Sequence, residues 1–173
     1  MTSEYPNFKG NNPFASQAKM LCHLGSLREW KYTGTTSSPI LMEMNLTNRC
    51  NLNCQWCINA NFRGSVSLDT DSTLLFIRDY AAIGGRALTF SGGGEPTLHK
   101  SFQKFAEEAR CLGLHLGLMT NGTFRAGLID TIRENFKWVR VSLDTTDPGM
   151  YRSWKQSDLL PVVLNNIKQL HGG

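Results

Sequence analysis

Short apolar segments alternate with amphipathic helical segments along most of the chain, and this alternation constrains the fold more than any other feature. The expected strands are residues 40–46, 87–91, 114–119 and 138–143, and the helices expected to follow them are residues 70–83, 101–112, 126–135 and 159–170. Strand–helix units in succession, joined by short loops, are typical of a parallel sheet with right-handed crossovers. The sequence therefore predicts an α/β fold of about four βα units, with ligands bound at the carboxyl ends of the strands.

Capping residues support the boundaries of these elements. Asp69, Thr70 or Asp71 can cap the first of the four helices, and Ser101 is expected to cap the second. The segment Asp147–Gly149, which has a proline at its centre, indicates a turn. The last helix has a proline in its first turn, a position that helices favour.

The first 39 residues form an expected N-terminal extension, and residues 40–173 form the main domain. Apolar residues at helical intervals predict one helix over residues 15–31, and a loop composition follows at 33–39. Four βα units would leave an edge strand exposed, which proteins usually cover. We therefore expect the domain to be incomplete at its C-terminus or completed by a partner chain. An open half-barrel that is complete in itself is the alternative.

Composition excludes several classes of protein. The chain has 173 residues, 40% of them hydrophobic and 18% charged, as in a globular domain with a real core. The net charge of +4 is not concentrated in a basic block, so nucleic acid is not indicated. The polar N-terminus is no secretory signal, and no apolar run is long enough to span a membrane. Clustered free thiols without an export signal predict the cytoplasm.

Three cysteines lie close together directly after the first expected strand. Cys50, Cys54 and Cys57 have the spacing C-x3-C-x2-C, and no fourth cysteine is near them. Three thiolates can hold three irons of a [4Fe-4S] cube and leave the fourth iron free to bind a small molecule. The motif therefore predicts an iron–sulfur site with an open coordination position.

Other uses of these cysteines are weaker predictions. A disulfide framework suits short secreted chains with an even cysteine count, but this chain has five cysteines. A structural zinc site needs a fourth ligand, and His23, His99 or His115 would supply one without the usual spacing. A zinc-binding interaction module that is not an enzyme is therefore the alternative function. Clustering in an Asn-rich loop argues against buried inert thiols.

A second motif follows the second expected strand. Ser91 leads into three consecutive glycines, Glu95 and Pro96, and glycines let a backbone approach a ligand closely. Alone, such a loop indicates only a flexible turn, and it matches neither the dinucleotide-binding pattern nor a P-loop. It lies one βα unit after the cysteines, however, and so belongs to the same edge of the sheet.

With these two motifs in this order, the sequence resembles the radical S-adenosylmethionine (SAM) superfamily. The resemblance covers roughly residues 40–170 and rests on C-x3-C-x2-C after the first strand and Gly-Gly-Glu-Pro after the second. Residues 120–122 (Thr-Asn-Gly) and 141–144 (Val-Ser-Leu-Asp) also look like the ends of that family's third and fourth strands. The implied fold is a partial (βα) barrel, typically of six βα units, of which about four are visible here.

The resemblance also implies how the two cofactors would be held. Cys50, Cys54 and Cys57 would bind the [4Fe-4S] cluster, and SAM would chelate the open iron through its amino and carboxylate groups. The loop residues that match the family motif would meet the amino group of SAM through backbone carbonyls. These loop residues are Gly93, Gly94, Glu95 and Pro96.

Four further residues match positions that contact SAM in the family. Trp56 would lie by the adenine, although it is equally expected as a core aromatic near the cluster. Ser142 and Asp144 would reach the ribose or the carboxylate, with a polar strand-end turn as the alternative. Asn121 would face the same pocket, but Asn-Gly is first of all a turn signal.

The implied activity is reductive cleavage of SAM to a 5′-deoxyadenosyl radical, which abstracts hydrogen from a peptide or small-metabolite substrate. The electron would come from an external reductant, such as a flavodoxin or ferredoxin. Backbone amides of residues 51–55 are candidates for hydrogen bonds to the sulfurs, and no catalytic residue beyond the cluster and the SAM site is indicated. The adenine-packing motif of the family's fifth strand is missing. Cys22 and Cys111 are isolated, so no second cluster is expected in this chain.

Overall fold

The computed structural model describes residues 23–35 and 38–172. Contacts divide the chain into two compact units, Met1–Ser37 and Ser38–Gly173. In the first unit, helix α1 covers Leu24–Thr33 and ends at Gly34, whose φ of 75° is left-handed. The part of the expected helix 15–31 that precedes residue 23 lies outside the described residues. The domain boundary expected after residue 39 stays a prediction.

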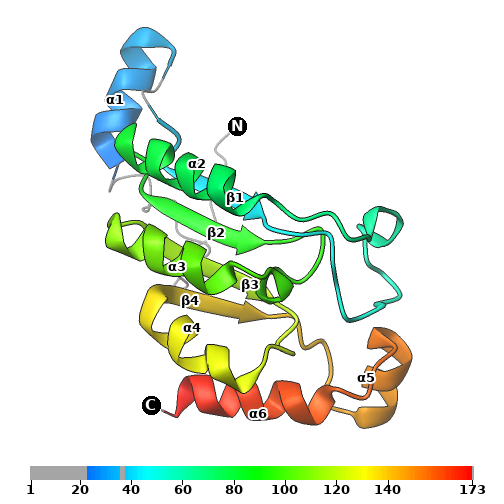
Figure 1. The fold of residues 1–173 in the computed structure, drawn as a ribbon. Helices are drawn as coiled ribbons and strands as arrows, with labels where there is room; N and C mark the ends of the chain where they lie inside the picture. Colours follow the sequence, from blue (N-terminus) through cyan, green and yellow to red (C-terminus); the bar gives the residue numbers. More distant parts are fainter. Residues whose placement is uncertain (1–22, 36–37, 173) are drawn as a thin grey trace, which may run out of the picture. The chain divides into compact units, whose positions relative to one another are not determined.

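The second unit contains a parallel sheet of four strands in the order β1-β2-β3-β4 (Figure 1). The strands are β1 Leu41–Asn45, β2 Ala87–Ser91, β3 His115–Thr120 and β4 Phe136–Val141. The predicted α/β fold with a parallel sheet is thus confirmed. All four carboxyl ends lie at one edge, where the cysteine and glycine loops follow β1 and β2.

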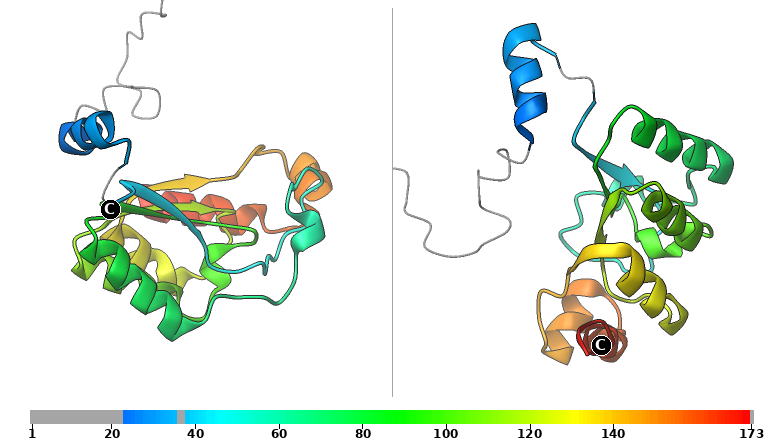
Figure 2. Two further views of the ribbon diagram at one scale, coloured as in Figure 1. Left: turned by 90° about the horizontal axis from the view of Figure 1, so that it is seen from above. Right: turned by 90° about the vertical axis from the view of Figure 1, so that its left-hand side faces the viewer.

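The helices that connect the strands lie on one face of the sheet. They are α2 Thr70–Ala82, α3 Phe102–Cys111 and α4 Ile129–Asn135, and α6 Leu160–His171 follows β4. Short 3-10 turns, η2 Ala60–Phe62, η3 Pro96–Leu98 and η4 Ala126–Leu128, occur in the loops. The view from above in Figure 2 shows α2, α3 and α4 on the same side of the strands. The single helix expected at 126–135 consists of the 3-10 turn η4 followed by the α-helix α4.

The core lies between the sheet and these helices. Phe90 of β2, Phe102 of α3 and Phe136 form an aromatic cluster, in which Phe102 and Phe136 are stacked with centroids 5.6 Å apart. Phe90 and Leu88 alternate along β2 and are fully buried, as period-two geometry requires for the covered face. Full burial of such a side chain stabilises the fold by about 1.5–3 kcal/mol.

The capping predictions were right for α2 and wrong for α3. Asp69 accepts a hydrogen bond from the amide of Ser72 at 3.0 Å and caps α2. Ser101 stands at the cap position of α3, but its side chain makes no capping hydrogen bond. Its hydroxyl is instead 2.7 Å from that of Thr70 and links the starts of the two helices.

The turn expected at Asp147–Gly149 is wrong, because a helix begins there. Helix α5 covers Pro148–Lys155, and Asp147 caps it by accepting a hydrogen bond from Met150 N at 2.7 Å. An Asp followed by Pro occurs at the start of helices as well as in turns. The glycine after the proline favoured the prediction of a turn. Figures 1 and 2 show α5 beside the loop that follows β1, beyond the carboxyl ends of the strands.

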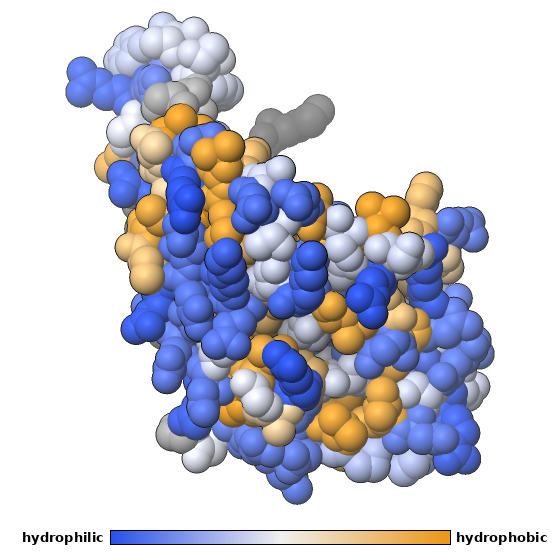
Figure 3. Space-filling model, in the orientation of Figure 1, coloured by the Kyte–Doolittle hydropathy of each residue, from blue (hydrophilic) through white to orange (hydrophobic). Residues whose placement is uncertain are grey.

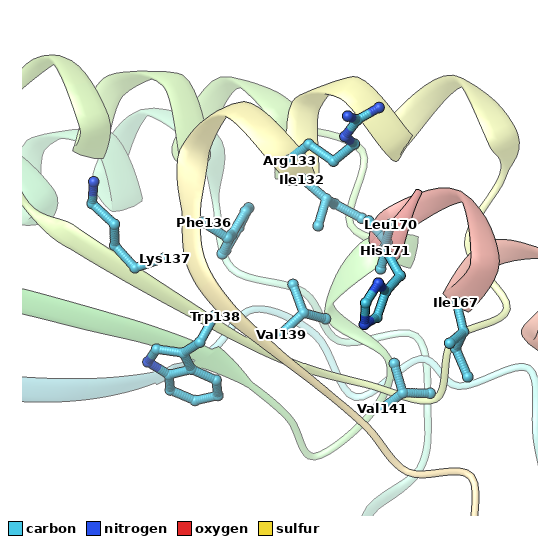
Figure 4. Close-up of a pocket in the computed structure, with 10 residues that line it drawn as sticks. All are labelled: Ile132, Arg133, Phe136, Lys137, Trp138, Val139, Val141, Ile167, Leu170 and His171. Carbon is cyan, nitrogen blue, oxygen red and sulfur yellow. The ribbon is translucent and has the colours of Figure 1, made fainter. Parts of the chain in front are cut away.

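The outer edge of β4 borders an apolar groove of about 420 Å³ between β4, α4 and α6 (Figure 4). Val139, Val141 and Leu170 are among the residues that line it. Figure 4 shows Trp138 on the opposite side of β4 from Val139. There the indole covers Gly117 of β3, where an added Cβ would lie 2.2 Å from the ring.

The face covered by helices is mainly hydrophilic, and hydrophobic surface interrupts it over α2 (Figure 3). Leu75 and Phe76 of α2 are about half exposed. Among the described residues, none of the helices has the length and apolarity needed to cross a bilayer.

We predict that Asn166→Ala destabilises the fold. The buried Asn166 amide donates to the carbonyls of Gly122 and Phe124 at 2.8 and 2.7 Å, which fixes α6 against the loop after β3. Loss of both bonds should lower the free energy of unfolding by about 2–3 kcal/mol in urea denaturation. The neighbouring Asn165→Ala, at an exposed position, is the control and should change it by less than about 0.5 kcal/mol. Equal effects would contradict this account of the α6 contact.

Candidate active site at the carboxyl edge of the sheet

The three predicted cysteines meet the glycine loop around one cavity. Cys50, Cys54 and Cys57 are free thiols of intermediate exposure, and they line a cavity of about 300 Å³ together with Gly92–Gly94. The cysteines follow β1 and the glycines follow β2, so the parallel order of the sheet brings the two motifs together. The sequence therefore predicted this juxtaposition correctly.

Helix α5 holds the cysteine loop in place. The amides of Asn53 and Gln55 donate to the carbonyls of Lys155 and Trp154 at 3.1 and 3.0 Å. The Asn53 side chain also donates to Oε1 of Gln156 at 2.6 Å. The last carbonyls of a helix have no partner within the helix. Two of the amides that were expected to donate to sulfur donate to these carbonyls of α5 instead. The expectation is wrong for these two residues.

Trp56 packs against α5 and stands outside the set of residues that line the cavity. Its ring contacts Trp154 edge to face at 5.3 Å, and the Lys155 ammonium lies 5.7 Å from its centroid. The side chain remains 51% exposed, so it is not a core aromatic. The structure gives Trp56 a role in the contact between the loop and α5.

Lys155 is a buried cation at the cavity wall that sequence reasoning missed. Its side chain is 3% exposed, forms an ion pair with Asp144 and lines the cavity. Asp144 has a left-handed φ of 63°, which turns this residue out of the strand direction. Of the two predicted strand-end residues, Ser142 lines the cavity, whereas Asp144 reaches it only through Lys155. The sequence signal that could have revealed Lys155 is the start of α5 at Asp147, which was predicted as a turn.

The surroundings act in opposite directions on two of the cysteine thiols. Burial raises the pKa of the Cys54 thiol, while the nearby charge of Lys155 opposes this rise. Burial would also raise the pKa of Cys57, but contact with the Arg63 guanidinium and the Asn59 amide outweighs it, so the pKa of Cys57 is lowered. Two cations, Arg63 and Lys155, therefore flank the three thiols.

The glycine loop is fixed to the segment that leads into Cys50. The amide of Gly94 donates to the Thr47 carbonyl at 2.9 Å, and that of Glu95 donates to the Arg49 carbonyl at 2.7 Å. A Cβ added at Gly94 would lie 2.0 Å from the Arg49 carbonyl oxygen. A glycine is required here because two backbones are in contact, whether or not a ligand is bound.

Glu95 is among the residues that line the cavity, but its carboxylate is buried and engaged by the protein. Its carboxylate, which is 2% exposed, accepts hydrogen bonds from the Thr97 and Thr120 hydroxyls at 2.6 and 2.7 Å and from the Asn121 amide at 2.7 Å. Burial raises the pKa of Glu95, and these hydrogen bonds act in the opposite direction. Glu95 thus ties the loop after β2 to the end of β3. Pro96 follows as the buried first residue of η3.

Asn121 joins the cavity to the cysteine loop. It lines the cavity, and its Nδ2 donates to Oδ1 of Asn51 at 2.9 Å and lies 3.9 Å from Sγ of Cys50. The amide and hydroxyl of Thr123 donate to its Oδ1 at 2.9 and 2.7 Å. Asn121 therefore lines the cavity and also fixes the loop after β3.

Two of the histidines considered as zinc ligands are placed elsewhere. Both ring nitrogens of His99 are engaged, Nε2 with the Leu68 carbonyl at 2.9 Å and Nδ1 with the Ser101 amide at 3.0 Å. His115 begins β3, at the opposite end of the strand from the cysteines. Among the described residues, no three His, Cys, Asp or Glu side chains are grouped as ligands of a single metal ion.

The donor set fits an iron–sulfur cluster with SAM beside it. Each ligand of a cube binds a different iron, so three thiols around a cavity suit a cluster without converging on one point. The cavity also includes the glycine-loop backbone, Asn121 and Ser142, which are polar groups able to bind an amino acid. Cys50, Cys54 and Cys57 would hold the cluster, and these other groups would hold SAM.

The chain belongs to the radical SAM superfamily, whose family model matches residues 44–172. This match confirms the resemblance, and with it SAM and an iron–sulfur cluster as the cofactors that the family implies. The comparisons give no support to the zinc-binding alternative.

The similar proteins are enzymes of different specificity. A probable GTP 3',8-cyclase of Pyrococcus abyssi is 28% identical over 130 residues, which are 74% of this chain and 42% of that protein. A PqqA peptide cyclase of Xanthomonas campestris pv. campestris is 31% identical over 121 residues, 66% of this chain and 31% of that protein. The chain thus spans less than half the length of these relatives.

Solved structures share the fold at low sequence identity. Streptococcus suis SuiB bound to S-adenosylmethionine gives a TM-score of 0.72 at 16% identity, covering 96% of this chain and 38% of that one. This likeness confirms the predicted fold of the radical SAM type.

We predict that Gly94→Ala damages the cysteine loop by steric contact with the Arg49 backbone. Overpacking against backbone should cost about 3 kcal/mol of unfolding free energy, measured in urea on the cluster-free protein. Gly127→Ala is the matched control, because a Cβ there has nothing within 4 Å. If the two variants are equally stable, the close approach of the two loops is wrong.

Proposed function

We propose that this chain forms the SAM-cleaving core of a radical SAM enzyme. Cys50, Cys54 and Cys57 would ligate a [4Fe-4S] cluster, and the other residues of the cavity would hold SAM beside its open iron. When bound, the two cofactors supply a 5′-deoxyadenosyl radical that abstracts hydrogen from the substrate. The observation that carries this proposal is the single cavity lined by the three thiols and the glycine loop.

The residues of the cavity orient SAM. Backbone carbonyls of the loop Gly93–Pro96 accept hydrogen bonds from its amino group, and Asn121 and Ser142 bond its polar groups. The buried Lys155 ammonium attracts the carboxylate, while Asp144 fixes the position of that ammonium. Trp56 lies beside Lys155, outside the cavity lining, and its exposed ring would contact the adenine from there.

The substrate is a peptide or a small metabolite. Relatives support both classes, since one is a probable GTP 3',8-cyclase and another a PqqA peptide cyclase. A flavodoxin- or ferredoxin-like protein delivers one electron at a time, and the enzyme works in the cytoplasm. The open edge of β4 and the apolar groove beside it fit a further βα unit that extends the partial barrel.

We predict that Cys54→Ala abolishes cluster assembly, because only two thiolates remain in the loop. Iron and sulfide analysis after anaerobic reconstitution should give about four irons per chain for the wild type and close to none for the variant. Cys111→Ala is the matched control, since this exposed thiol lies on α3. The control should bind iron as the wild type does.

Two results would contradict the proposal. Full iron content in Cys54→Ala would remove this residue from the ligand set. One colourless zinc ion per chain in the wild type, with no visible absorption, would show a zinc site instead of a cluster.

A further inference from the structure

Two polar side chains near the cysteine loop, the buried Tyr151 and the partly exposed Arg63, carry buried donor atoms without partners. Among the described residues, the buried side-chain atoms without a hydrogen bond include Oη of Tyr151 and the Nε and Nη2 atoms of Arg63. Buried donors are almost always hydrogen-bonded. An unpaired donor beside the cysteine loop therefore indicates that its acceptor is a group that binds to the loop, such as an iron–sulfur cluster. Sulfur atoms of thiolates and sulfides are such acceptors.

Tyr151 lies on the face of α5 that holds the cysteine loop. It is 1% exposed and precedes the buried Lys155 by four residues, so both side chains project from the same side of the helix. The carbonyls of Trp154 and Lys155 bind the loop amides one turn further on. Burial raises the pKa of Tyr151, and the charges of Cys54 and Asp144 add to the rise. The ring packs with Leu160 and Val163, and the hydroxyl has no partner in this buried position.

Arg63 lies on the other side of the loop, beside Cys57. Its Nη1 donates to Oδ1 of Asn53, which leaves Nε and Nη2 buried and unpaired. Contact with the Cys57 thiol raises the pKa of Arg63, and the charges of Cys50 and Cys54 act in the same direction. Neither Arg63 nor Tyr151 is among the residues that line the cavity in which SAM would lie.

We propose that Tyr151 and Arg63 are positioning residues that donate hydrogen bonds to the cysteine sulfurs of the assembled cluster and raise its reduction potential. This inference rests on the proposed function. One-electron reduction by the external reductant adds one negative charge to the cluster and its thiolates. A hydroxyl donor and a cation nearby stabilise this reduced form more than the oxidised form.

The test is a redox titration of the anaerobically reconstituted chain, followed by the electron paramagnetic resonance (EPR) signal of the reduced cluster. Tyr151→Phe removes the hydroxyl but keeps the ring, and should make the cluster about threefold harder to reduce. Arg63→Gln also removes a charge and should have a larger effect, about tenfold, which for one electron is 59 mV towards negative potential.

Matched controls separate tuning from general damage. Tyr80→Phe also removes a buried hydroxyl, one that lies within 3.1 Å of the carbonyls of Pro39, Ile40 and Ala87, far from the cysteines. It should lower the stability of the fold and leave the potential unchanged. Arg78→Gln, which breaks an exposed ion pair with Glu108, should change neither. In the cluster-free protein, Tyr151→Phe should be no less stable than the wild type, because its hydroxyl has no partner there.

Equal potentials in Tyr151→Phe, Arg63→Gln and the wild type would overturn the inference while leaving the proposed function intact. If a folded variant assembled no cluster, that side chain would serve assembly, and its assigned role in tuning would be wrong. Failure of the wild type itself to form a cluster would instead contradict the proposed function.

Discussion

The hydrogen bonds from the Asn53 and Gln55 amides to the last carbonyls of α5 hold the site together. They join the loop after β1 to the helix after β4, and the side-chain bond from Asn53 to Gln156 links positions 103 residues apart. Gln156 adopts a left-handed φ of 52°, which ends the helix and leaves its carbonyls available to the loop. The same contact places Lys155 at the cavity wall. A cysteine motif without this helix would be an unsupported surface loop.

A second anchor acts from the opposite side of the cavity. The backbone of Gly94 and Glu95 pairs with the segment before Cys50, and the Glu95 carboxylate binds the end of β3. Burial of a carboxylate costs free energy, and loss of its hydrogen bonds would leave that cost without compensation. The Glu95 carboxylate therefore fixes the loop after β2 in one position rather than binding a ligand. The loop therefore offers its backbone to a ligand while its one charged side chain faces inward.

The fold and the centre of the site were predictable from sequence because they depend on local patterns. Period-two and helical spacing predicted the four strands, and the alternation of strands and helices predicted their parallel arrangement, which places the cysteine and glycine loops at one edge. The rest depends on contacts between distant segments. The burial of Lys155 depends on α5, whose start at Asp147 was predicted as a turn, and the inward turn of Glu95 carries no sequence signal. The steric reason for Gly94 is a contact between two backbones, which only the structure shows.

The most direct test of the proposed function is EPR spectroscopy of the anaerobically reconstituted, dithionite-reduced chain, recorded with and without SAM. If SAM binds the open iron within this chain, a [4Fe-4S]+ signal should be present and should change when SAM is added. A cluster signal that is the same with and without SAM would contradict the claim that the cavity beside the three cysteines is a SAM site.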